Sequence, residues 1–210
     1  MAIQNVISLY NKALEENTHL YNGMEYIGSH PYVSGSAFWR TDTLQEGSIY
    51  YDGVFYPNIF LAYDAAKEEV VIKNRQRTSI KLLPEKINYF NLLNQLFVHI
   101  TSDSTNNYGF KSGWYNILYD GVVTVLAKRR KVALRVLTPT DHYEFREQSF
   151  YFINKDGRYY AVDTKSALFT ALHDKKEEIK KFVQKNKLNF KKDLENTLIK
   201  TADYYSQLKK

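Results

Sequence analysis

A chain of 210 residues with 44% hydrophobic and 15% aromatic residues suits one folded domain, 1–210, and excludes a disordered polypeptide. The absence of cysteine excludes disulfide bonds, a thiol nucleophile and thiolate metal sites. The net charge of +6 is carried by the segment from Lys175 to Lys210, which has 11 lysines and 5 acidic residues. Because the rest of the chain is neutral, a nucleic-acid surface that covers the whole domain is not expected.

The first predicted element is an N-terminal helix over roughly residues 1–16. The pattern starts immediately after Met1, as expected of an exported chain cut behind its signal peptide with Met1 and Ala2 added by a vector; a cytoplasmic protein would look the same. No apolar run reaches the roughly 20 residues that a membrane-spanning helix needs, so we expect no transmembrane segment. The apolar residues at helical spacing are Ile3, Val6, Ile7, Tyr10, Ala13 and Leu14.

After a polar connector, short runs of β-branched and aromatic residues alternate with turn signals from Ser36 to about Thr164. Three Asp-Gly pairs, at 52–53, 120–121 and 156–157, predict hairpins with two-residue turns, because both turn positions favour a positive φ. Successive hairpins indicate an antiparallel β meander over 36–164.

The residues beside the first two turns raise a specific expectation. A two-residue turn at 52–53 pairs Tyr50 with Phe55 on one face and Tyr51 with Val54 on the other. Both faces are apolar there and around 120–121, so we expect the second face to be covered or to line a cavity. The third turn, flanked by Lys155 and Arg158, should project into water. The candidates for contact with an apolar ligand or a partner are Tyr50, Phe55, Leu118 and Val123.

The apolar spacing becomes helical again after Thr164 and predicts C-terminal helices over 165–210. The segment 186–193 interrupts them, with Asn189 or Asp193 as the N-cap of the last helix. The predicted fold class is therefore α+β: an N-terminal helix, a large curved antiparallel meander resembling a half-barrel, and C-terminal helices.

Two groups of basic residues are candidates for a contact surface. One lies in the strand segment 124–136, the other in the lysine-rich tail, which could meet an acidic partner or anionic lipid at the membrane periphery. The favoured interpretations are a charged hairpin edge that resists strand pairing and the solvated face of a docked helix. The residues in question are Arg129, Arg130, Lys131, Lys180 and Lys181.

No motif identifies a reaction. The five histidines lie far apart without metal-ligand spacing, no G-x-S-x-G elbow links a strand to a helix, and the glycines stand singly at turns. We therefore predict no catalytic, cofactor-binding or metal-binding residue and no enzyme. A hydrolase with a dispersed site is the least favoured function.

The "YDG"-bearing meander and the ending "DGRYYAV…KKEEIKKFVQKNKLNFKKDLENTLIKTADYYSQL" resemble a group of uncharacterised secreted or envelope proteins of Bacteroidota. The resemblance covers most of the chain and implies export to the periplasm or the outer membrane; a cytoplasmic location stays open. In architecture alone, the curved sheet is similar to the half-barrels of periplasmic lipoprotein carriers.

These observations lead to a ranked expectation about function. The leading one is a non-enzymatic accessory or interaction protein of the cell envelope with a protein partner in a membrane-associated complex. The alternative is a carrier that holds a lipid or another apolar ligand in the concave face of the sheet.

Overall fold

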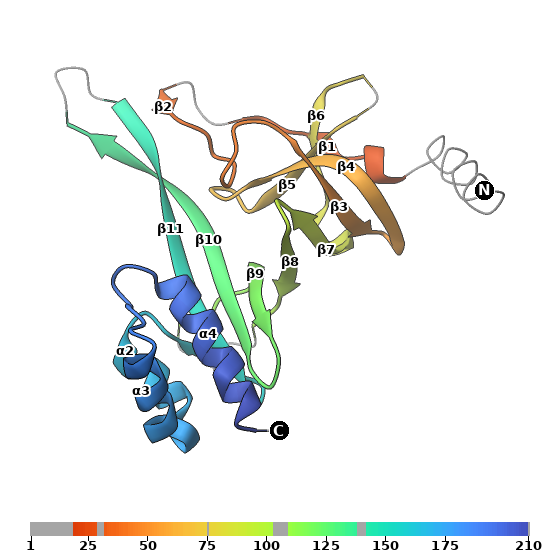
Figure 1. The fold of residues 1–210 in the computed structure, drawn as a ribbon. Helices are drawn as coiled ribbons and strands as arrows, with labels where there is room; N and C mark the ends of the chain where they lie inside the picture. The colour runs from red at the N-terminus through yellow and green to blue at the C-terminus, as the bar shows by residue number, and fades with distance from the viewer. Residues whose placement is uncertain (1–18, 29–31, 75, 103–108, 138–141, 210) are drawn as a thin grey trace.

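A computed structural model describes residues 19–28, 32–74, 76–102, 109–137 and 142–209 (Figure 1). In these ranges the α-helices follow the last strand and are α2 Lys165–Ala171, α3 Lys176–Lys185 and α4 Leu194–Gln207. The strands are β1 Met24–Glu25, β2 Val33–Ser34, β3 Gln45–Tyr51, β4 Val54–Asp64, β5 Glu69–Lys73, β6 Ser79–Lys81, β7 Ile87–Leu92, β8 Gln95–Ile100, β9 Gly113–Asp120, β10 Thr124–Val136, β11 His142–Lys155 and β12 Arg158–Ala161.

All the strands belong to one open sheet in the order β1-β6-β5-β4-β3-β7-β8-β9-β10-β11-β12, with β2 paired to β11. Every pair is antiparallel except β2 with β11, so the predicted meander of mixed α and β structure is confirmed in its main features. The N-terminal helix expected over residues 1–16 lies outside the described residues and stays a prediction.

Two of the three predicted turns have the expected form. Asp52 and Gly53 both have a positive φ, at 51° and 81°, and Tyr50 pairs with Phe55. Asp156 and Gly157 repeat this geometry at 52° and 75°. Such turns match the right-handed twist of the strands that they join.

The prediction for the turn at 120–121 is wrong. Asp120 pairs with Thr124, so the loop has three residues and the register shifts beyond it. The cause is helix α4, because the Ser206 hydroxyl accepts a hydrogen bond from the Val122 amide at 3.2 Å. A Cβ on Gly121 would lie 2.9 Å from the same hydroxyl oxygen and 2.7 Å from the Tyr119 ring.

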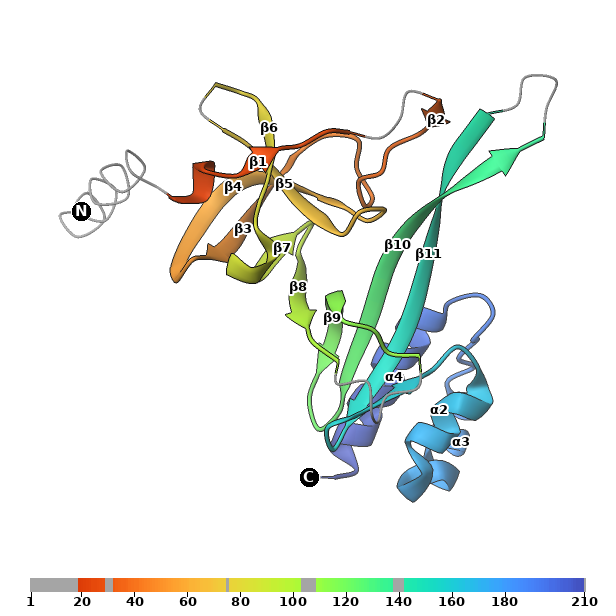
Figure 2. The same ribbon diagram turned by 180° about the vertical axis from the view of Figure 1, so that it is seen from behind.

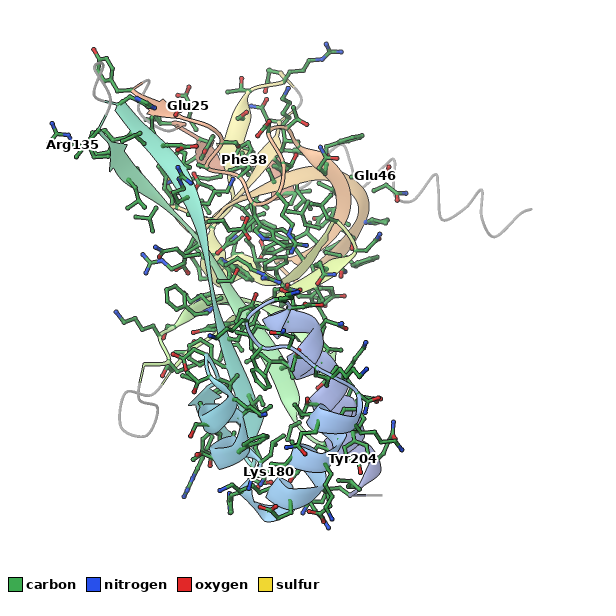
Figure 3. All side chains as sticks on the ribbon, turned by 60° about the vertical axis from the view of Figure 1, so that its left-hand side comes forward. Glu25, Phe38, Glu46, Arg135, Lys180 and Tyr204 are labelled. Carbon is green, nitrogen blue, oxygen red and sulfur yellow. The ribbon has the colours of Figure 1, made fainter. Side chains whose placement is uncertain are left out.

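The inner face of the sheet carries two hydrophobic cores. Strands β3 to β9 surround the first, which is dominated by fully buried rings such as Trp39, Tyr63, Phe90 and Phe97. Figure 3 shows these strands curling around that core. Aromatic side chains favour β-strands, so the aromatic-rich composition agrees with the large sheet.

Helices α2, α3 and α4 cover the inner face of β9 to β12 and form the second core (Figure 2). Thr164 caps α2 by accepting a hydrogen bond from the Ala167 amide, and Asp193 caps α4 by accepting one from Asn196. The predicted cap at Asp193 and the break before it are confirmed. One face of β9 connects the two cores. It carries Trp114 in the first core, then Asn116, then Leu118 at the second core.

A third, smaller cluster covers the outer face of the C-terminal strands. Phe110 packs over Tyr115 and Phe152, with its ring stacked 4.5 Å from that of Tyr115 and 5.1 Å from that of Phe152 in an edge contact. The outer face of β3, β4 and β7 has no such cover among the described residues, and Phe55 is 48% exposed. The expectation that the sheet is covered on both faces therefore holds around β9 to β11 and fails at the first hairpin.

Candidate functional site

Strands β10 and β11 continue beyond the sheet as a long two-stranded ribbon. Beta9 pairs with β10 only up to Ala127, whereas the β10–β11 ladder continues to Val136 and His142. We call the segments 130–136 and 142–148 the arm. In Figure 1 it projects past the curled strands, away from the helices, with β2 beside its outer end.

The arm exposes large apolar side chains on both of its faces. Leu134 is 44% exposed and Tyr143 is 46% exposed, and Leu137, just behind β10, is 80% exposed. Alternation along a strand places Leu134 with Val132 and Val136 on one face and Tyr143 on the other. A ribbon of two strands cannot bury either face by itself, which leaves these groups available to another surface.

Charge accompanies this apolar surface. The arm has more basic than acidic residues. The basic ones are Arg130, Lys131, Arg135 and Arg146, and the acidic ones are Glu144 and Glu147. Arg146 and Glu144 form an ion pair at 2.7 Å. Tyrosine and arginine side chains are among those that contribute most to binding energy at protein interfaces.

The base of the arm is held firmly to the rest of the molecule. The Lys131 amide donates a hydrogen bond to the Ala65 carbonyl at 3.0 Å, and its Nζ donates one to the Ser36 carbonyl at 2.7 Å. Towards the outer end, the Tyr143 amide donates to the Tyr32 carbonyl, and β2 pairs with Tyr143 and Glu144. The arm is thus a preorganised projection, which lowers the entropic cost of binding.

Arg129 lies just below the arm and is not part of its surface. It is 1% exposed, and its guanidinium donates to the side chains of Asn116 at 2.9 Å and Ser149 at 3.1 Å. Glu195, at the start of α4, forms an ion pair with it at 2.9 Å. This network ties the sheet to the last helix. The Arg129 side chain, a candidate for a contact surface in the sequence, is therefore unavailable to an outside partner.

Two neighbouring groups complete the electrostatics of this junction. Tyr151 donates a hydrogen bond to Glu195 at 3.2 Å, and burial together with this carboxylate raises the pKa of its hydroxyl. On the outer face, Lys128 is buried and paired with Glu68 at 3.0 Å. The ion pair neutralises Lys128 within the fold and Tyr151 is uncharged, so neither residue adds to the basic surface of the arm.

The basic candidates from the sequence do not form one surface. Arg130 is exposed on the arm and Lys131 is half-buried at its base, whereas Lys180 and Lys181 lie on α3. Figure 3 labels Arg135 and Lys180 at opposite ends of the molecule. Lys180 pairs with Glu177 at 2.7 Å on the solvated side of its helix.

The four apolar candidates also separate into two places. Tyr50 and Phe55 lie on the uncovered outer face, where Tyr50 stacks on Tyr89 with ring centroids 5.6 Å apart. Leu118 and Val123 lie in the second core beneath the helices, and Val123 is fully buried. Only the first pair can meet a ligand or partner without unfolding.

Side chains fill the space inside the curled strands. Phe90 and Phe97 stack at 4.8 Å, and Trp39 and Trp114 close on this pair in edge contacts at 5.0 and 5.1 Å. This packing of large rings is that of a core. It weighs against a concave face that holds a lipid.

In the part of the chain that the structure describes, the titratable groups form pairs and networks within the fold. No cluster of three or more His, Asp and Glu residues there could hold a metal ion. His99 packs edge-on against Trp114, and burial together with Lys128 lowers its pKa. At the far end of the helices, Asp174 accepts hydrogen bonds from Lys155 and Tyr205, a structural arrangement.

The sequence reasoning missed the apolar residues of the arm. Val132, Leu134 and Val136 alternate with charged or small residues, a pattern that predicts a strand with one covered face. Nothing in that pattern reveals that the covering element is absent from the described fold. The length of the uninterrupted segment 124–136 was the signal that could have indicated the arm, because so long a strand easily extends beyond its neighbours.

Comparison of the chain with protein-family models, with curated proteins and with solved structures gave no match. None of the helices in the described ranges has the length and apolar character needed to cross a lipid bilayer.

Proposed function

We propose that the protein is a non-enzymatic accessory protein of the cell envelope that binds a partner subunit through the arm. The observation that carries the proposal is the exposure of Leu134 and Tyr143 on an anchored ribbon of two strands. Burying the part of each side chain that is still exposed would contribute about 1 kcal/mol. A partner that supplies an apolar groove would gain this energy without having to order the arm first.

The charge of the arm indicates the chemistry of that groove. Arg130 lies on the same face of the arm as Leu134, and Arg135 lies on the same face as Tyr143. Figure 3 shows Arg135 pointing outward. A groove with acidic residues at its rim would complement them, speeding association and selecting the orientation. In this proposal the strands β3 to β8 form a half-barrel-like scaffold that holds the arm, with its interior used as a core. Location in the periplasm or at the outer membrane rests on the resemblance of the sequence.

The proposal is tested by quantitative affinity purification of the full chain from its native host. The arm variant is Leu134→Ser with Tyr143→Ser, and the matched control is Val122→Ser with Phe150→Ser, which removes comparably exposed apolar groups outside the arm. We expect a protein that copurifies with the wild type and the control and is lost from the arm variant. Identical protein sets from both variants would contradict the proposal, as would a wild type with no copurifying protein.

Sedimentation of the purified chain separates a second copy from a different partner. A dimer that dissociates in the arm variant alone would contradict a hetero-partner, since the arm would then be a self-association surface. Native mass spectrometry of the same samples tests the carrier alternative. A copurified lipid whose retention is unchanged by the arm variant would favour the carrier instead.

A further inference from the structure

The uncovered outer face of β3, β4 and β7 has an ordered arrangement of side chains. The strand register places Phe55, Tyr50 and Tyr89 in one row across the three strands. Two residues further along, Ser48 and Asn91 form the next row, about 6.6 Å away by the rise of a strand. Because Ile49 and Phe90 between these rows are buried in the first core, both rows face outward.

The second row lies in a hollow of about 590 Å³. Its polar side chains come from four strands or turns: Glu46, Ser48, Asn58, Asn91 and Asn94. The Asn91 amide donates to the Ser48 hydroxyl at 3.2 Å, which holds both groups in place at the floor. The volume lies within the range of small-molecule sites, in which a few placed polar groups fix the orientation of the ligand.

The backbone around the hollow adopts unfavourable conformations at three residues that are not glycine. Asn58 has φ 54° and lies in a β-bulge, where β4 has one residue more than the facing segment of β3. Leu93 and Asn94 have φ 52° and 59° and form the turn between β7 and β8. Asparagine tolerates this region, but leucine does so only at a cost. Leu93 nevertheless occupies the first turn position, 37% exposed, with its side chain lining the hollow.

The chemistry of the lining selects a class of ligand. Three amides, one hydroxyl and one carboxylate offer many hydrogen bonds, and no lysine, arginine or histidine lines the hollow. An anionic ligand would therefore face Glu46 without a compensating cation. The aromatic row next to the amides offers flat apolar surface, and Phe60, opposite Glu46 and 60% exposed, offers more on the other side.

We propose that this face binds a neutral pyranose unit of a carbohydrate, independently of the arm. A pyranose ring combines an apolar C–H face with a rim of hydroxyl groups. These hydroxyls exchange hydrogen bonds with Asn58, Asn91 and Glu46. The aromatic row across β4, β3 and β7 then carries the next unit of the saccharide chain.

The test is isothermal titration of the full chain with five hexasaccharides at millimolar concentration: maltohexaose, cellohexaose, laminarihexaose, mannohexaose and xylohexaose. Asn58→Gly removes the amide and keeps the backbone conformation, because glycine accepts the same φ. Asp156→Gly makes the matching change at the turn between β11 and β12, where φ is 52°. We expect at least one hexasaccharide to bind, with affinity reduced at least tenfold by Asn58→Gly or Tyr50→Ala and unchanged by Asp156→Gly.

Leu93→Asn gives a second readout that a purely structural role would not produce. Asparagine suits the left-handed turn position, so the variant should have a higher denaturation midpoint than the wild type. The same change removes an apolar wall of the hollow and should weaken binding several-fold. Failure of all five saccharides to bind would overturn the inference, and so would binding that survives both Asn58→Gly and Tyr50→Ala. Neither result bears on the arm.

Discussion

The two halves of the sheet use similar hairpins but treat their outer faces differently. In the C-terminal half, Phe110 covers Tyr115 and Phe152 outside while helices cover the inside. In the N-terminal half, the inner face is packed with rings, yet Tyr50, Tyr89 and Phe55 stay on an open outer surface. Aromatic residues on both faces of a hairpin therefore do not by themselves indicate burial, because the cover comes from segments distant in sequence.

The largest expected effect concerns the junction where the halves meet. Arg129→Met leaves Asn116 and Glu195 without their buried partner and should lower the free energy of unfolding by about 3–5 kcal/mol. The measurement is urea denaturation followed by circular dichroism. Arg130→Met, one residue away and exposed, is the control and should change stability by no more than about 0.5 kcal/mol. Equal effects of the two substitutions would show that the buried network of Arg129 does not hold the sheet and the last helix together.

The second prediction addresses the contrast between the outer faces directly. Phe110→Ala should destabilise the protein by about 3 kcal/mol, because it removes a ring that is almost fully buried against Tyr115 and Phe152. Phe55→Ala makes the same chemical change on the open half and should stay within about 0.5 kcal/mol. Denaturation curves of the two variants measured side by side check this. A large loss for Phe55→Ala would mean that something covers that face after all.

The smallest expected effect depends on pH and is confined to the C-terminal half. Burial alone would raise the pKa of Asp174, but hydrogen bonds from Lys155, Lys209 and Tyr205 outweigh it and hold that pKa well below its ordinary value. The carboxylate therefore stabilises the fold at neutral pH. This contribution is lost as the pH falls below about 4, where the unfolded-state carboxyl takes up its proton and the folded one does not.

Asp174→Asn should accordingly cost about 1–2 kcal/mol at pH 7 and should flatten the loss of stability between pH 5 and acid. Unfolding curves at a series of pH values measure both quantities. A variant that keeps the full acid sensitivity of the wild type would place the responsible carboxylates elsewhere.

Several features followed from residues close together in the chain. Asp52 with Gly53 and Asp156 with Gly157 form the expected turns because each pair can adopt the required positive φ. The cap at Asp193 is equally local, since its side chain reaches an amide three residues ahead. The meander and the C-terminal helices follow from such signals together with the period of the apolar residues.

Other features depended on contacts between distant segments. Gly121 carries the same local signal as the other Asp-Gly pairs, but Ser206 of α4 binds the loop and changes its length. Arg129 and Arg130 are neighbours in a basic run, and only the fold decides that Asn116, Ser149 and Glu195 surround one of them while water surrounds the other. The arm and the hollow beside Asn91 also depend on the arrangement of distant segments. The arm forms because β10 and β11 extend beyond their neighbours, and the hollow forms beside a bulge in β4. Local propensity determined the elements of this protein, whereas which surfaces they cover or leave open was decided by tertiary packing, because burial is a property of neighbours in space.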